Sequence, residues 1–124
     1  VPNSLCRNEK KILIKKNLKF ARFYDDIKLG IKNVDCVMTD VWIGMGEKNN
    51  NNKKRILKKF QVNSKIMSQT KKNAIFMHCL PAHRNEEVTD SVIDSKQSVV
   101  WQQAQNRMYV QQSILCYLID NDKK

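Results

Sequence analysis

The stretch that most constrains the fold is residues 74–84, where an apolar run leads into a His-Cys pair and then a proline. A short continuous apolar segment of this kind is typical of a strand in a parallel sheet, buried on both faces. Pro81 has no backbone N–H for a neighbouring strand, so the strand should end at or just before it. Open α/β sheets bind ligands beyond the carboxyl ends of their strands. The sequence therefore predicts that His78, Cys79 and the Leu80 backbone reach a binding crevice.

Apolar segments with strand-like and helical spacing alternate along the chain. Strands are predicted at residues 18–24, 34–39, 74–80 and 98–101. Helices are predicted at residues 8–16, 27–31, 54–60, 62–71 and 103–119, with one helical turn covering 92 and 93. This alternation favours a parallel sheet built from βαβ units. We therefore predict an α/β, Rossmann-like three-layer domain that lacks its first strand or strands.

Length and composition restrict the class of protein. With 124 residues, 41% of them hydrophobic, the chain has the size of one small domain with a core. It contains no apolar stretch long enough to span a bilayer and no signal-peptide pattern, so no membrane association is expected. The four cysteines lack a tight spacing, which predicts free thiols and a reducing, cytoplasmic location. The first residue is valine, which suggests a piece of a longer product or a trimmed chain.

The net charge of +11 raises the possibility of nucleic-acid binding. The lysines are spread along the whole chain, among many asparagines, and no aromatic interleaving, zinc-finger spacing or RNA-binding signature accompanies them. Weak binding to polyanions at low salt follows from the charge alone. No specific nucleic-acid partner is therefore expected.

Three predicted strand ends supply a possible site. Asp40 and the 44–46 turn follow one strand, Cys79 follows another, and Arg107 lies near the start of the last helix. A carboxylate, a thiol and a guanidinium in one crevice suit a zwitterionic substrate. Each residue also has a simpler interpretation: Asp40 could brace its loop, Cys79 could be a small core residue, and Arg107 could lie on the surface.

His78, Cys79 and His83 are residue types that could bind a metal ion. Their spacing matches neither a structural zinc pair nor a zincin helix, so no metal is expected, and no cofactor is predicted.

Longer motifs add a family resemblance. The string MHCLPAHRNEEVTDSVID, preceded by TDVWIGMGE and followed by SVVWQQAQNRMYVQQSIL, resembles the C-terminal part of ornithine carbamoyltransferases. The resemblance covers residues 34–118, and its HCLPAHR segment resembles the bacterial, arginine-synthesising branch. It implies transfer of a carbamoyl group from carbamoyl phosphate to the δ-amino group of L-ornithine, which gives L-citrulline and phosphate.

The resemblance also implies roles for individual residues. Asp40 would hold the α-ammonium group of ornithine, and Gly44 and Met45 would lie in the loop that closes over this amino acid. Cys79 would be the proton acceptor near the attacking amine. Together with Leu80 and Arg107, Cys79 would also contact carbamoyl phosphate.

The chemistry fits these residue types. An amine like that of ornithine is protonated at neutral pH and must lose a proton before it attacks. A thiolate beside Arg107 could assist this step, and Arg107 could stabilise charge on the carbamoyl oxygen.

Two departures from the family pattern are visible. Gly44 stands where the family usually has a serine that contacts ornithine. The N-terminal carbamoyl-phosphate domain, with its Ser-Thr-Arg-Thr loop and His-Pro-x-Gln stretch, is absent from this sequence, as is the asparagine-bearing segment that begins the ornithine domain. Residues 1–124 are therefore expected to form a partial ornithine-binding domain that is inactive alone. The resemblance implies that the full-length form is a homotrimer.

Three other functions stay open at this point. A carbamoyltransferase for another amine, such as putrescine, would share most motifs, although Asp40 argues for a zwitterionic substrate. A non-catalytic remnant would keep the fold only. A basic binding module would use the charge alone.

Overall fold

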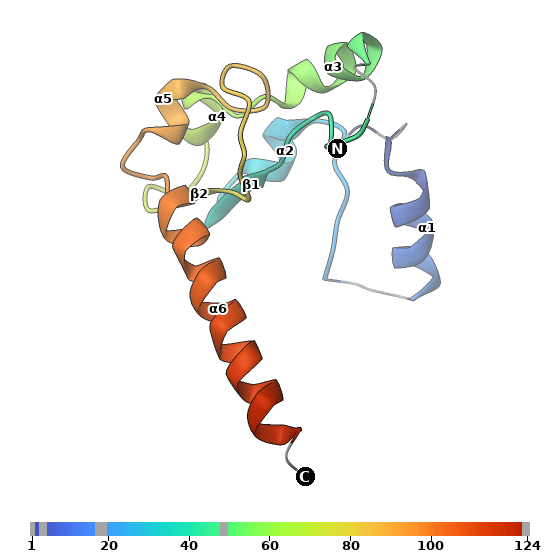
Figure 1. Ribbon diagram of the computed structural model, residues 1–124. Helices are drawn as coiled ribbons and strands as arrows, with labels where there is room; N and C mark the ends of the chain where they lie inside the picture. Colours follow the sequence, from blue (N-terminus) through green and yellow to red (C-terminus); the bar gives the residue numbers. More distant parts are fainter. Residues whose placement is uncertain (1, 3–4, 17–19, 48–49, 123–124) are drawn as a thin grey trace.

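The computed structural model describes residues 2, 5–16, 20–47 and 50–122, and Figure 1 shows how their elements are arranged. Two strands, β1 (Cys36–Thr39) and β2 (Ile75–His78), pair in parallel, with Cys36 opposite Ile75 and Thr39 opposite His78. The predicted α/β class with a parallel sheet is confirmed by this pair. Because the strand ends are in register, the residues that follow Thr39 and His78 leave the sheet at the same edge.

Two helices precede β1, as predicted: α1 (Arg7–Lys15) and α2 (Ile27–Ile31). Asp26 caps α2, because its carboxylate accepts a hydrogen bond from the Lys28 N–H at 2.9 Å. The strand predicted at 18–24 is wrong over its described part, which has no regular structure from residue 21 to 24. Residues 18 and 19 lie outside the described residues.

The connection from β1 to β2 is helical. It contains α3 (Asn51–Leu57), a 3₁₀ turn (Lys58–Phe60) and α4 (Ser64–Met67). Asn50 and Asn63 cap α3 and α4 through their side-chain oxygens, each at 3.0 Å from a backbone N–H. These caps explain why the helix predicted at 54–60 begins three residues earlier and why the one predicted at 62–71 begins only at Ser64.

After β2 come the short helix α5 (Asp90–Ile93) and the long helix α6 (Val100–Asn121). The fourth predicted strand, at 98–101, is wrong. It is reduced to one bridge between Phe76 and Ser98, because α6 already begins at Val100.

The core lies under one face of the sheet, and Phe76 in the middle of β2 has no exposed surface. Its buried members come from both strands, from α2, α4 and α5, from the loop residues Val62 and Val88, and from the start of α6. They are Ile31, Val37, Val62, Ile66, Met67, Phe76, Val88, Val92, Ile93 and Val100. Burying a side chain as large as Phe76 stabilises the fold by about 1.5–3 kcal/mol.

The other face of the sheet is open, so the prediction that β2 is buried on both faces is wrong. Cys36 and Met38 on β1, with Ile75 and Met77 on β2, alternate with the buried positions. Cys36, Met38 and Ile75 are exposed, and Met77 is partly buried. The described elements pack mainly against the opposite face.

Helix α6 extends away from the rest of the described chain (Figure 1). The predicted helix at 103–119 is confirmed, but from Ala104 to Asp122 every side chain is exposed. The exposed side chains include Met108, Leu115 and Ile119, which is 60% exposed. An apolar helix surface of this kind is normally covered by other protein.

Candidate functional site

Asp40 and Cys79 lie together at the edge of the sheet where β1 and β2 end. They directly follow Thr39 and His78, which are register partners. The Cys79 thiol donates a hydrogen bond to Asp40 Oδ1 at 3.1 Å, and the same oxygen accepts the Val41 N–H at 2.7 Å. The parallel pairing therefore brings together two residues that are 39 positions apart in the sequence.

The hydrogen bond between Cys79 and Asp40 shifts the pKa values of the two side chains in opposite directions. The pKa of Asp40 is lowered, chiefly by the hydrogen bond from Cys79 and then by that from the Val41 N–H, because both favour the carboxylate. The pKa of Cys79 is raised, first by the hydrogen bond to Asp40 and then by burial and by the charge of Asp40. Arg107 lowers it by less. Both shifts favour a thiol beside a carboxylate in this arrangement, rather than a thiolate beside Arg107.

Arg107 reaches Cys79 from α6. Its Nη1 donates to the Cys79 carbonyl oxygen at 3.1 Å. Cys79 is therefore the link between the other two residues, since its side chain contacts Asp40 and its backbone contacts Arg107.

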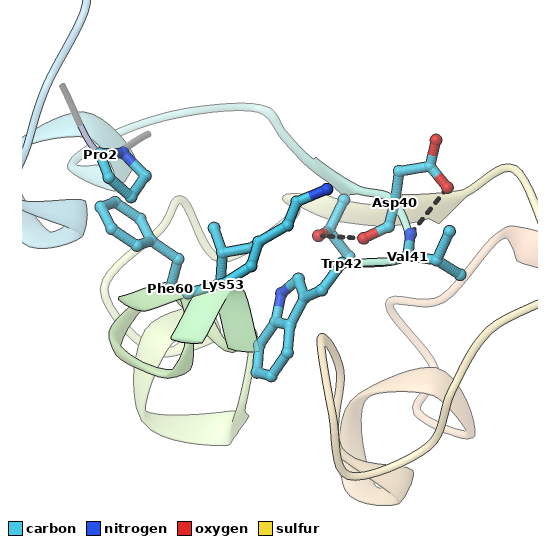
Figure 2. Close-up of a pocket in the computed structure, with 8 residues that line it drawn as sticks. Pro2, Asp40, Val41, Trp42, Lys53 and Phe60 are labelled. Carbon is cyan, nitrogen blue, oxygen red and sulfur yellow. Dashed lines mark hydrogen bonds between the residues drawn. The ribbon is translucent and has the colours of Figure 1, made fainter. Parts of the chain in front are cut away.

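Two hollows flank this link, one on the side of Asp40 and one on the side of Arg107. Figure 2 shows the first, with Asp40 and Val41 at one end and Pro2 and Phe60 at the other. Its volume is about 260 Å³, and Thr39, Trp42, Lys53 and Leu57 complete the lining. The second, of about 420 Å³, lies between Met77 and α6 and is lined by Gln103, Asn106, Arg107, Val110 and Gln111. They are separate because α3 flanks the loop after β1, whereas α6 flanks the open face of β2.

Met45, in the loop after Asp40, is 96% exposed and so packs little against the residues at this edge. A Cβ atom placed on Gly44 would be 3.5 Å from Glu47 Oε1, an ordinary contact, so this position has room for a Cβ atom. Gly46 differs, because its φ of +86° is a conformation that side chains disfavour.

Leu80 is held by the histidine two residues before it. Its backbone has a φ of 52°, which is unusual for a branched residue, and its N–H donates to His78 Nδ1 at 2.9 Å. Because Nδ1 accepts this bond, the proton of a neutral His78 lies on Nε2. This hydrogen bond fixes the turn that carries Cys79 and Leu80.

Glu87 is a functional candidate that the sequence analysis did not single out. Glu87 and His78 have no exposed surface, and Glu87 Oε1 lies 3.3 Å from His78 Nε2. The same Oε1 accepts the His83 N–H at 2.6 Å. Glu87 thus supports both ends of the turn around Cys79, and no spacing signal distinguishes it from Glu86.

Two groups of side chains have donor atoms close enough for a metal ion. The first is Asp40, His78 and Cys79, and the second is His83, Glu86 and Glu87. In the first group, the Cys79 thiol already donates to Asp40 Oδ1, and His78 Nδ1 already accepts the Leu80 N–H. None of the helices in the described ranges has the length and apolar character that a membrane span requires.

Comparison with known proteins agrees with the motifs. Residues 2–118 match the family described as aspartate/ornithine carbamoyltransferase, Asp/Orn binding domain. Ornithine carbamoyltransferase from Bradyrhizobium diazoefficiens is 50% identical over 95 residues, which are 77% of this chain and 31% of that protein. The chain therefore spans about a third of this relative's length.

Two solved structures share the fold. The ornithine carbamoyltransferase of Pyrococcus furiosus is 48% identical with a TM-score of 0.67, over 73% of this chain and 29% of that one. The Thermus thermophilus enzyme is 30% identical with a TM-score of 0.73, over 87% and 34% of the two chains.

Proposed function

The chain belongs to the aspartate/ornithine carbamoyltransferase family, and we propose that it forms the ornithine side of an enzyme that carbamoylates L-ornithine. The reaction would use carbamoyl phosphate and yield L-citrulline and phosphate, as in arginine biosynthesis. Residues 1–124 would be part of the ornithine-binding domain, in a cytoplasmic protein.

The observation that carries this proposal is the position of Cys79 between Asp40 and Arg107. The three residues supply an acceptor for an ammonium group, a sulfur near the amine and a cation for an anionic substrate. Asp40 would bind the α-ammonium group of ornithine by a charge-assisted hydrogen bond. Gly44 and Met45 would cover the amino acid by movement of their exposed loop.

Carbamoyl phosphate would lie on the other side of Cys79. Arg107 would stabilise the charge that develops on the carbamoyl oxygen, and the turn at Cys79 and Leu80 would contact the same substrate. A phosphate cradle would come from the rest of the longer protein, which we propose to be a homotrimer.

Substrate binding would also change the proton affinity of Cys79. The largest cause of its raised pKa is the hydrogen bond to Asp40. An ammonium group on Asp40 would replace this bond and neutralise the carboxylate. The pKa of Cys79 would then fall, with Arg107 acting in the same direction, and the sulfur could accept a proton from the δ-amine.

A chimeric enzyme tests the proposal. The matching third of the Bradyrhizobium diazoefficiens enzyme is replaced by this chain, and citrulline is measured with ornithine and carbamoyl phosphate. We expect turnover by the chimera, none by the 124-residue chain alone, and loss of activity in the Asp40→Asn and Cys79→Ala chimeras. A Gly44→Ser chimera should have a lower KM for ornithine, by about 2- to 10-fold for one added hydrogen bond.

The outcomes separate the remaining alternatives. A folded chimera that carbamoylates putrescine but not ornithine would replace the proposed substrate. A folded chimera that acts on neither amine would show that this chain is a non-catalytic remnant. Circular dichroism of each chimera confirms folding before activity is compared.

A further inference from the structure

A second group of donor atoms lies in the loop after β2, beyond the Asp40–Cys79–Arg107 link. His83, Glu86 and Glu87 each place one donor atom within 4.8 Å of the other two. His83 Nδ1 is 3.9 Å from Glu86 Oε2. The His83 side chain is half-exposed, so an ion could reach the group from solvent.

Two carboxylate oxygens in this group are buried and have no hydrogen-bond donor: Glu86 Oε2 and Glu87 Oε2. The Glu87 side chain has no exposed surface at all. A buried carboxylate oxygen without a partner is costly, and such atoms in native proteins usually have a specific explanation. A bound cation would provide one partner for both oxygens.

The other oxygen of each glutamate is already bound to the protein. Lys54 Nζ lies 2.5 Å from Glu86 Oε1, and the His83 N–H donates to Glu87 Oε1 at 2.6 Å. These contacts hold the carboxylates in place and leave Oε2 of each one free. His78 Nε2 also lies 3.3 Å from Glu87 Oε1, so the unpartnered oxygen is Oε2 in both glutamates.

The backbone of the loop is also fixed. The Glu86 N–H donates to the His83 carbonyl oxygen at 3.0 Å, which places both side chains on one turn. Gln61 Nε2 donates to the Glu86 carbonyl oxygen at 2.7 Å and anchors this turn. Binding would therefore require little ordering of the backbone.

We propose that His83, Glu86 and Glu87 bind a divalent cation of the zinc class. One imidazole nitrogen and two carboxylate oxygens are common zinc ligands, and a fourth position would remain for water. Donor atoms on tetrahedral zinc are roughly 3.3–3.5 Å apart, given metal–ligand distances of about 2.0–2.2 Å. The three donors, which lie within 4.8 Å of one another, would need to close by up to about 1.5 Å on binding. Because Glu87 also faces His78, a bound ion would act on the turn that carries Cys79.

Titration calorimetry with zinc chloride alone tests the site in the 124-residue chain. The chain carries Cys79→Ala, which removes the sulfur donor of the Asp40, His78 and Cys79 group. We expect one zinc ion per chain and a rise in Tm on binding. Adding His83→Ala should weaken binding by at least about 10-fold. Glu86→Gln should weaken it as well, and provides a second variant if one of them folds poorly.

The matched control is Asp94→Asn, which removes one negative charge from the same region but no proposed ligand. Its zinc affinity should equal that of the Cys79→Ala parent. Equal affinity in the His83→Ala variant, or no binding at millimolar zinc, would overturn the proposal. Equal weakening by Asp94→Asn would show that only net charge attracts the ion, which would overturn it too. Circular dichroism of each variant confirms that the fold is retained.

Discussion

Two regions of the molecule differ in which side chains they bury. One is the segment from β2 to Val88, and the other is helix α6. The first segment buries two ionisable side chains, His78 and Glu87, which contact each other and the backbone of the turn between them. Helix α6 exposes large apolar side chains such as Leu115 and Tyr117, which is 68% exposed. The β2 segment thus buries polar side chains, whereas α6 exposes apolar ones.

This difference shows which contacts each region needs. The β2 segment is completed by residues of this chain, from β1, α5 and the first turn of α6. Helix α6 has regular backbone bonds but little packing beyond its first turns, and helices without packing are only marginally stable in water. Relatives about three times longer have protein that could cover it.

The prediction with the largest expected effect tests this contrast by shortening one apolar side chain in each region. Phe76→Ala in β2 should lower the free energy of unfolding by about 3–5 kcal/mol, because it leaves a cavity in the core. Leu115→Ala in α6 should change it by no more than about 0.5 kcal/mol, because Leu115 is 59% exposed. Urea unfolding followed by fluorescence of the buried Trp42, in a Trp101→Phe background, measures both. A similar cost for Leu115→Ala would mean that α6 is packed.

A prediction with a smaller expected effect compares the alkylation rates of one cysteine from each region. At pH 8, iodoacetamide should modify Cys79 more slowly than Cys116, because Cys116 is exposed on α6 and the pKa of Cys79 is raised by Asp40. Asp40→Asn removes the negative charge that raises this pKa, so more thiolate forms and alkylation of Cys79 should accelerate several-fold. Mass spectrometry of the modified peptides gives both rates. The Cys116 rate should stay constant, and an unchanged Cys79 rate would contradict the role assigned to Asp40.

The smallest effect concerns acid stability of the loop and α5. Arg84 contacts Asp90 at 2.7 Å and Asp94 at 2.5 Å, and it is the main cause of the lowered pKa of both. A carboxylate with a lowered pKa stabilises the fold above its unfolded pKa of about 3.9, and this contribution is lost as pH falls through the folded value. Arg84→Ala should therefore lower Tm slightly at pH 7 and make no difference at strongly acidic pH.

The control for this measurement is Arg55→Ala, since the Arg55 guanidinium contacts the uncharged Asn52 side chain at 3.1 Å. Its small effect on Tm should not depend on pH. The helical signal of α6 should be the same in both variants, because the Arg84 contacts lie outside that helix.

Local signals in the sequence predicted much of the fold. The apolar run before Pro81 indicated β2, and the spacing of apolar residues indicated α6, because both elements depend on hydrogen bonds within or beside one segment. The number of strands was wrong, since whether residues 20–24 or Ser98 pair depends on neighbours that the sequence does not reveal. The meeting of Asp40, Cys79 and Arg107 was predicted from the parallel order of the strands.

What the sequence by itself determined is the family, the strand and helix that carry Cys79 and Arg107, and the residue types at the candidate site. Only the tertiary structure decided that Cys79 is a thiol bound to Asp40, that Glu87 is buried against His78, and that α6 is left uncovered. The reason is physical. Protonation and burial depend on which groups from distant segments surround a side chain, and such surroundings exist only after the chain has folded.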